Sequence, residues 1–144
     1  MIEQDTVKLL RECDSGARMG VASIEDVMGY VHAAELSKVL TECRDAHEQL
    51  SREIQQELDR FQDEGKKPSP VAERMSWLMS NMKLMMHESD HTIADLMTDG
   101  CNMGVKSLNR YLNQYQAADE KSKDIAKKLI SLEEKLTADI RPFL

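Results

Sequence analysis

The sequence predicts an all-α protein folded as a four-helix bundle. Its composition, the spacing of its apolar residues and a match between its two halves all support this class. Of the 144 residues 41% are hydrophobic but only 4% are aromatic, a balance that suits packed helices better than a sheet. Apolar residues recur at helical spacing along almost the whole chain. A chain of this length buries about 70% of the surface that its unfolded form exposes. We therefore expect one domain over residues 1–144.

The apolar spacing predicts long helices over residues 4–31, 34–63, 91–116 and 119–140. The clear breaker run inside the chain is 64–70, where Pro70 favours the first turn of a further helix over 70–87. Ser89 and Asp90 favour an N-cap, so the next long helix is expected to start after them. Short turns then give antiparallel hairpins over 4–63 and 91–141, with the 70–87 helix as a crossover between them.

The two hairpins match each other in sequence. Residues 15–23 align with residues 99–107 at an offset of 84, with five of nine identical. Residues 48–54 align with residues 134–140 at an offset of 86, with three of seven identical. Two matches in the same order at nearly the same offset indicate an internal duplication.

The matched segments 15–23 and 99–107 lie in the first and third long helices, and each contains a pair of glycines four residues apart. The pairs are Gly16 with Gly20 and Gly100 with Gly104. Glycine inside a helix costs about 1 kcal/mol relative to alanine. A glycine face lets two backbones approach closely, so we expect these helices to pack against each other there, about a pseudo-twofold axis. The alternative is that the glycines are merely tolerated on the surface.

A duplicated helical hairpin joined by a crossover resembles the ferritin-like superfamily, and in particular small bacterial ferritin-like four-helix-bundle proteins. The resemblance covers most of the chain but has no sharp motif. It implies ferritin-like topology. The stretches that carry it are Leu9 to Ile54 with Gly16, Glu35-Leu36 at the start of the second helix, Trp77, and Gly100 to Tyr111.

Iron-binding members of that superfamily carry a Glu on each of two helices and Glu-x-x-His on each of the other two. This chain departs from that pattern. Gly20 and Gly104 stand where carboxylates are expected, and Arg44 stands three residues before His47 in place of Glu. Glu133 occupies the position equivalent to His47 in the last helix, which has no histidine. The departures argue against di-iron oxidase chemistry.

A degenerate metal site is the alternative that these residues leave open. His47 and Glu133 would face each other across the bundle and hold iron, manganese or zinc, with Glu42 or Asp45 as further ligands. The competing interpretation is that His47 is a hydrogen-bonded structural residue near the core.

Residues 87–91 spell His-Glu-Ser-Asp-His, which matches the HExxH pattern of zinc peptidases. That chemistry needs a continuous helix and a third ligand, whereas Ser89 and Asp90 predict a helix start inside the motif. A peptidase is therefore disfavoured. A weak surface metal site at His87 and His91 remains as an alternative to two solvated histidines.

Four methionines follow helical spacing in the expected crossover helix, at Met75, Met79, Met82 and Met86, with Trp77 beside them. Thioethers suit Cu(I), but flexible Met side chains more often fill an irregular core or form an adaptable interface. We expect this stripe to be a partner-binding or dimer surface.

The charge and the cysteines exclude other classes. The net charge of −7 and pI near 5.1 disfavour nucleic acid and anionic membrane as partners. No apolar run is long enough to span a membrane, and the first residues lack the features of a signal peptide. Cys13, Cys43 and Cys101 are unclustered, as reduced thiols of a soluble cytoplasmic protein would be. We therefore expect a non-enzymatic bundle without a cofactor that acts as a homodimer or through a protein partner.

Overall fold

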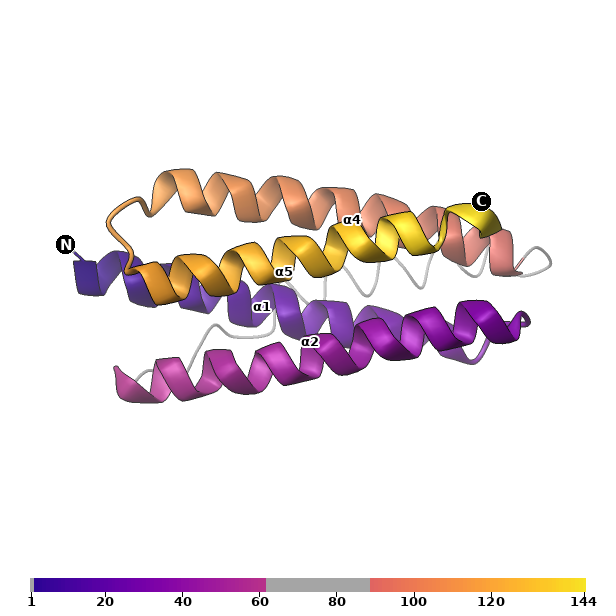
Figure 1. Ribbon diagram of the computed structural model, residues 1–144, viewed down its shortest axis with the longest axis horizontal. Coiled ribbons are helices and arrows are strands. Elements are labelled where there is room, and N and C mark those ends of the chain that lie inside the picture. Colours follow the sequence, from indigo (N-terminus) through magenta and orange to yellow (C-terminus); the bar gives the residue numbers. More distant parts are fainter. Residues whose placement is uncertain (1, 62–88) are drawn as a thin grey trace.

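The computed structural model describes residues 2–61 and 89–144, and over these ranges the protein is an all-α bundle without strands (Figure 1). The expected fold class is confirmed at that level. The expected crossover helix over 70–87 lies outside the described residues. The described elements are α1 (Ile2–Met28), α2 (Ala34–Arg60), α4 (Ser89–Gln114), α5 (Glu120–Asp139) and a closing 3₁₀ turn, η2 (Arg141–Phe143).

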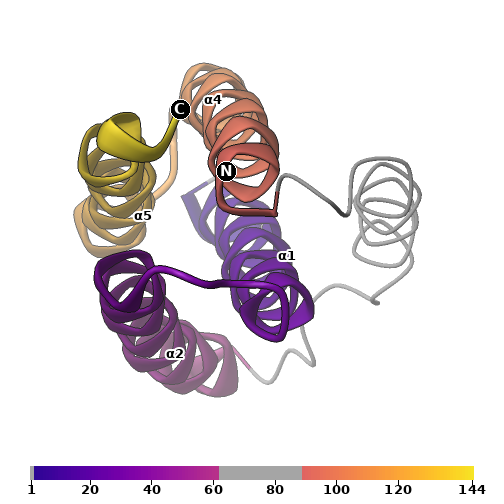
Figure 2. The same cartoon turned by 90° about the vertical axis from the view of Figure 1, so that its right-hand side faces the viewer.

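The four helices lie nearly parallel to one long axis. Helices α1 and α5 run in one direction along it, and α2 and α4 run in the other (Figure 1). Viewed end on, the order around the bundle is α1, α2, α5, α4 (Figure 2). The most extensive packing joins α1 to α2 and α4 to α5, so each consecutive pair is an antiparallel hairpin. Among the described residues, no helix is both long and apolar enough to cross a membrane.

Two apolar clusters fill the bundle, one toward each end. Full burial of a Leu or Ile side chain contributes about 1.5–3 kcal/mol, so these clusters hold the helices together. The cluster at the α1–α2 turn has Ile24, Leu36, Leu40, Ile93 and Ile140 among its fully buried members. The cluster at the α4–α5 turn includes Leu9, Leu10, Ile54, Leu58, Ile125 and Leu129.

Between the two apolar clusters, the core contains glycines and charged side chains in place of large apolar ones. Each helix contributes one residue to this middle layer: Gly20 from α1, His47 from α2, Gly104 from α4 and Glu133 from α5. The sequence analysis singled out the same four residues, with Gly20 and Gly104 where carboxylates are expected and Glu133 at the position equivalent to His47. The polar middle layer is where the candidate site lies.

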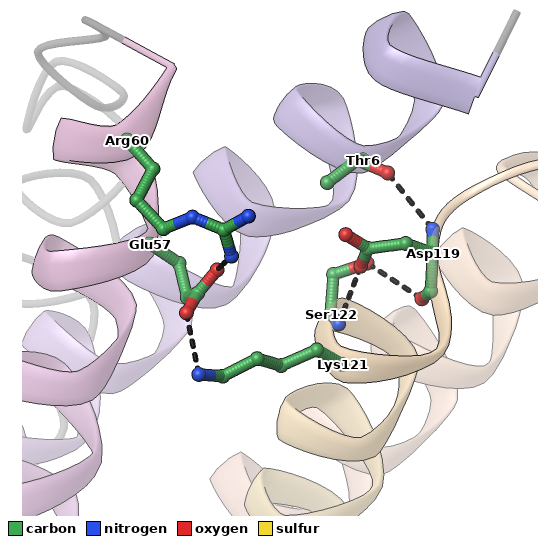
Figure 3. A network of polar contacts seen from close by, with 6 residues as sticks. All are labelled: Thr6, Glu57, Arg60, Asp119, Lys121 and Ser122. Carbon is green, nitrogen blue, oxygen red and sulfur yellow. Dashed lines mark hydrogen bonds and ion pairs between the residues drawn. The ribbon is translucent and has the colours of Figure 1, made fainter.

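Side chains at the start of α1 hold the α4–α5 turn in place. Asp119 caps α5, because its Oδ1 accepts from the Ser122 amide at 2.8 Å. The Asp119 amide in turn donates to Oγ1 of the buried Thr6 at 2.8 Å (Figure 3). The Ala117 amide donates to Oδ2 of Asp5 at 3.0 Å. The α4–α5 turn is therefore bonded to α1 at two amides.

Asp90, in the first turn of α4, holds the α1–α2 turn in place. Its two carboxylate oxygens accept from the amides of His32 at 2.8 Å and Ala33 at 2.9 Å. The expectation that α4 starts after Asp90 is wrong, because the helix begins at Ser89 and Asp90 lies in its first turn. The carboxylate satisfies amides at the start of α2, where Ala33 has no capping side chain of its own.

A buried carboxylate ties α2 to α5 at the same end as Thr6. Glu57 is almost fully buried and is paired with two cations, Arg60 and Lys121, each at 2.7 Å (Figure 3). Removing one partner of a buried pair is costly because it leaves the charge uncompensated. Figure 3 thus shows a structural network, in which each labelled residue contacts at least one of the others.

Candidate ligand-binding site

The middle layer contains a direct contact between His47 and Glu133. Nε2 of the imidazole lies 2.9 Å from Oε1 of the carboxylate. The imidazole is 1% exposed and the Glu133 side chain 13% exposed. Two residues 86 positions apart in the sequence therefore form a buried pair that joins α2 to α5.

Both nitrogens of His47 face acceptors. Nδ1 lies 2.8 Å from the backbone oxygen of Cys43, which can only accept, so Nδ1 carries a proton. Burial opposes a charge on the ring, but the contacts with Cys43 and Glu133 outweigh it and raise the pKa of His47 to about 10. The pair is thus an imidazolium with a carboxylate at neutral pH.

A thiol is a second neighbour of the Glu133 carboxylate. Burial raises the pKa of Cys101 well above its ordinary value, and Glu133 raises it further through its charge and as a hydrogen-bond acceptor. The Cys101 thiol is therefore protonated and donates to Glu133. The sequence analysis did not indicate this contact, because Cys101 is far along the chain from both the other cysteines and Glu133.

The glycines of the middle layer make room for the pair. A Cβ placed on Gly20 would lie 2.6 Å from Cδ2 and 2.8 Å from Nε2 of His47, which is too close for real atoms. A Cβ placed on Gly104 would lie 3.5 Å from the carboxylate of Glu133, an ordinary contact. Gly20 is thus required by the position of the imidazole, whereas Gly104 leaves the carboxylate uncovered.

The structure differs from the expected close contact of the two glycine faces. For Gly16, Gly20 and Gly104 the nearest neighbours of an added Cβ are side chains of α2 and α5, not the facing helix. At Gly100 an added Cβ would meet no atom of the described residues within 4 Å. The physical reason is that glycine has no side chain, so the four glycines leave a space between α1 and α4.

That space is a cavity of about 380 Å³, and all four glycines line it. Its size falls within the range of ligand pockets in proteins, roughly 300–1,000 Å³. Most of its surface is apolar. His47 and Glu133 lie on its α2 and α5 side, and its apolar wall includes Ile24, Met97, Leu108 and Leu129.

The charged groups along the cavity are few. Its described lining contains the carboxylates of Glu12 and Glu133, the imidazole of His47, and no Lys or Arg. Hydroxyl groups at Ser15, Ser23, Ser107 and Tyr111 add neutral polar positions. The sequence did not point to these hydroxyls, because single serines on a helix carry no distinguishing pattern.

A metal role finds little support in this geometry. Within residues 2–61 and 89–144, no group of three or more His, Cys, Asp or Glu side chains could hold a metal ion. Glu42 and Asp45 were considered as further ligands, but both are exposed whereas His47 is buried. His47 contacts Glu133 through Nε2 and the Cys43 backbone oxygen through Nδ1, so neither ring nitrogen is available to a metal while these contacts are formed.

The other residues singled out in the sequence do not join this site. His91 is exposed on the first turn of α4, and His87 lies outside the described residues. The stripe of Met75, Met79, Met82 and Met86, together with Trp77, also lies outside them. Their expected metal and interface roles stay predictions.

The chain was compared with known protein families, curated proteins and solved structures, and no match was found.

Proposed function

We propose that this chain is a non-enzymatic, ferritin-like helical bundle that binds a small apolar molecule in the cavity between α1 and α4. The observation that carries the proposal is the cavity itself, with an apolar wall and a single buried ion pair at its floor. Binding sites of this kind combine a mostly apolar lining with a few placed polar groups.

The ferritin-like part of the proposal rests on helix direction. Because α2 and α4 run the same way, the end of α2 and the start of α4 lie at opposite ends of the bundle (Figure 1). The end of α2 and the start of α4 are thus separated by the length of the bundle, the separation that the long crossover of ferritin-like folds spans.

The duplication is supported by the polar contacts at the two hairpin turns. Asp5 and Asp90 are 85 positions apart, and so are the amides of His32 and Ala117 that they accept from. Buried positions correspond at the offset of 84 as well. The buried pairs are Leu9 with Ile93, Cys13 with Met97, Ala17 with Cys101, and Ile24 with Leu108.

A binding role fits the site better than a catalytic role. An imidazole whose pKa is raised to about 10 is already protonated at neutral pH and does not serve as a general base. The Cys101 thiol, whose pKa is raised, is a poor nucleophile because the thiolate is the reactive form. The ionisable groups that meet in the cavity therefore hold each other in place.

The proposal is tested by calorimetric titration of the intact protein with octanol as a neutral apolar probe. The matched variants are Gly100→Phe, which adds a ring at the cavity lining, and Gly100→Ala, which adds a single methyl group where no described atom lies within 4 Å. We expect Gly100→Phe to weaken binding by about tenfold or more, equivalent to ~1.4 kcal/mol. Gly100→Ala should bind like the unmodified protein.

Two results would contradict the proposal. One is the absence of measurable octanol binding by the intact protein. The other is equal binding by the unmodified protein and Gly100→Phe, which would place the probe elsewhere. The expected homodimer or protein partner stays a separate prediction, which light scattering on the purified chain tests.

A further inference from the structure

Resting on the proposed ligand-binding function, we propose that the cavity selects a lipophilic amine, whose protonated nitrogen donates to the carboxylate of Glu133. The apolar body of the ligand would lie along the wall formed by α1 and α4.

Glu133 is the member of the ion pair that a ligand can reach. Its side chain retains 13% exposure, whereas that of His47 retains 1%. Oε1 accepts from His47, and Oε2 lies 3.5 Å from the Cβ position of Gly104, a residue of the cavity lining. A carboxylate has about four lone-pair positions. The bonds from His47 and Cys101 therefore leave acceptor capacity.

An anionic ligand has no counterpart in this cavity. The one cation among the lining residues that the structure describes is His47, and both its N–H groups are already used, by the backbone oxygen of Cys43 and by Glu133. The charges of His47 and Glu133 offset each other, and the described lining contains no Lys or Arg that would attract an anion. A carboxylate or phosphate headgroup would meet neutral hydroxyl groups of the lining but no cation with a free N–H group.

A protonated amine fits the same surroundings. Its N–H groups would meet the accepting oxygen of Glu133, and a charge-assisted hydrogen bond is about twice as strong as a neutral one. The apolar wall lowers the local dielectric constant, which strengthens the attraction further. A neutral alcohol could donate one hydrogen bond but would lack the charge. The expected order of affinity is thus amine, then alcohol, then carboxylate.

The test compares three probes that share one alkyl chain: octylamine, octanol and octanoate. Each is titrated into the full chain at pH 7 by calorimetry. Like a lysine side chain, octylamine stays protonated at this pH. We expect octylamine to bind about tenfold more tightly than octanol, a difference of ~1.4 kcal/mol. Octanoate should bind more weakly than octanol.

Two variants separate recognition by Glu133 from general attraction to an acidic protein. Glu133→Gln keeps an oxygen that can accept from His47 but removes the charge, and Glu134→Gln removes the same charge from the exposed neighbouring position. Glu133→Gln should lower octylamine affinity about tenfold and octanol affinity clearly less, and circular dichroism checks that the variant folds. Glu134→Gln should bind all three probes as the unmodified chain does.

The outcomes are distinguishable. If the three probes bind the unmodified protein equally, or octanoate binds most tightly, the amine proposal is overturned while the ligand-binding function stands. An equal loss of octylamine affinity in both variants also overturns it, because the preference would then reflect net charge alone. If none of the three probes binds, the proposed function fails as well.

Discussion

His47 on α2 and Glu133 on α5 form an ion pair of 2.9 Å that divides the core of the bundle into two apolar clusters. The imidazole packs under Gly20, and the carboxylate faces the cavity beside Gly104. One buried contact thus accounts for the glycine in α1, for the polar middle layer, and for the single charged position at the floor of the cavity. The predictions below follow from this arrangement.

The fit between Gly20 and His47 predicts a stability difference between two glycine-to-alanine changes. Gly20→Ala would force the imidazole away from both of its partners, and we expect a loss of about 1–3 kcal/mol in the free energy of unfolding. Gly100→Ala meets no described atom within 4 Å and removes a helix-destabilising residue, so it should gain up to about 1 kcal/mol. Urea unfolding of both variants measures the difference, and equal midpoints would refute it.

The raised pKa of His47 predicts that stability falls as the pH rises. The pKa is about 10 in the folded state and near 6.5 in the unfolded chain, so folding retains a proton that unfolding releases. The resulting stabilisation is complete below pH 6.5 and is lost progressively between pH 6.5 and 10. Urea midpoints between pH 6 and 8.5 should decline.

His47→Gln is the control for that pH dependence, because glutamine keeps hydrogen-bonding groups but does not titrate. Its urea midpoints should be lower at pH 6 and nearly constant up to pH 8.5. Thiol ionisation in the unfolded chain starts to contribute only near the ordinary thiol pKa of 9.0. An equally steep decline in the variant would show that another group is responsible.

The contact between Thr6 and Asp119 predicts the effect of removing one hydroxyl group. Thr6→Val keeps the shape of this buried side chain but leaves the Asp119 amide without its acceptor. Because the bond is only partly buried, its loss should cost about 0.5–1.5 kcal/mol. Thr6→Ser, which retains the hydroxyl, should lose clearly less. Thermal unfolding of the pair checks this, and a Val variant as stable as the Ser variant would disprove the role of the bond.

The burial of the cysteines predicts that the thiols are unreactive in the folded protein. Burial, and then the charges of Glu12 and Asp14, raise the pKa of Cys13 to about 12 from 9.0. The thiolate fraction at pH 8 is then about a thousandfold lower than in the unfolded chain. Cys43 and Cys101 are also free and buried. Ellman's reagent should label these thiols only after denaturation, and rapid labelling of the native protein would argue against this packing.

Much of the bundle could be predicted because apolar periodicity directly reports which face of each helix is buried. Apolar residues within the expected helices, such as Leu36, Leu40, Ile54 and Leu129, are buried. The boundaries were less predictable. The first helix ends at Met28, three residues before the expected end, where the Tyr30 amide bonds to the Val27 oxygen in a tighter turn. Such an ending depends on packing of the turn, which the apolar pattern does not encode.

The candidate site was predictable in part. The opposed positions of His47 and Glu133 followed from the offset between the two halves, because equivalent residues of a duplicated hairpin meet across the bundle. The cavity did not follow from the sequence. A glycine face is compatible both with close backbone contact and with space for side chains from other helices, and only the distances between helices decide. Asp90 shows the same limit, since its carboxylate accepts from the amide donors of His32 and Ala33 on the neighbouring turn, a contact that its local capping preference did not indicate.

The central claim is that the cavity between α1 and α4 takes a small apolar ligand, and methionine methyl NMR tests it most directly. Met19, Met97 and Met103 line the cavity, whereas Met28 packs against the apolar cluster at the α1–α2 turn. When octanol is added to protein labelled at the methionine methyl groups, the signals of the three lining residues should shift and that of Met28 should stay in place. Unchanged signals from all three lining residues, or an equal shift at Met28, would contradict the account.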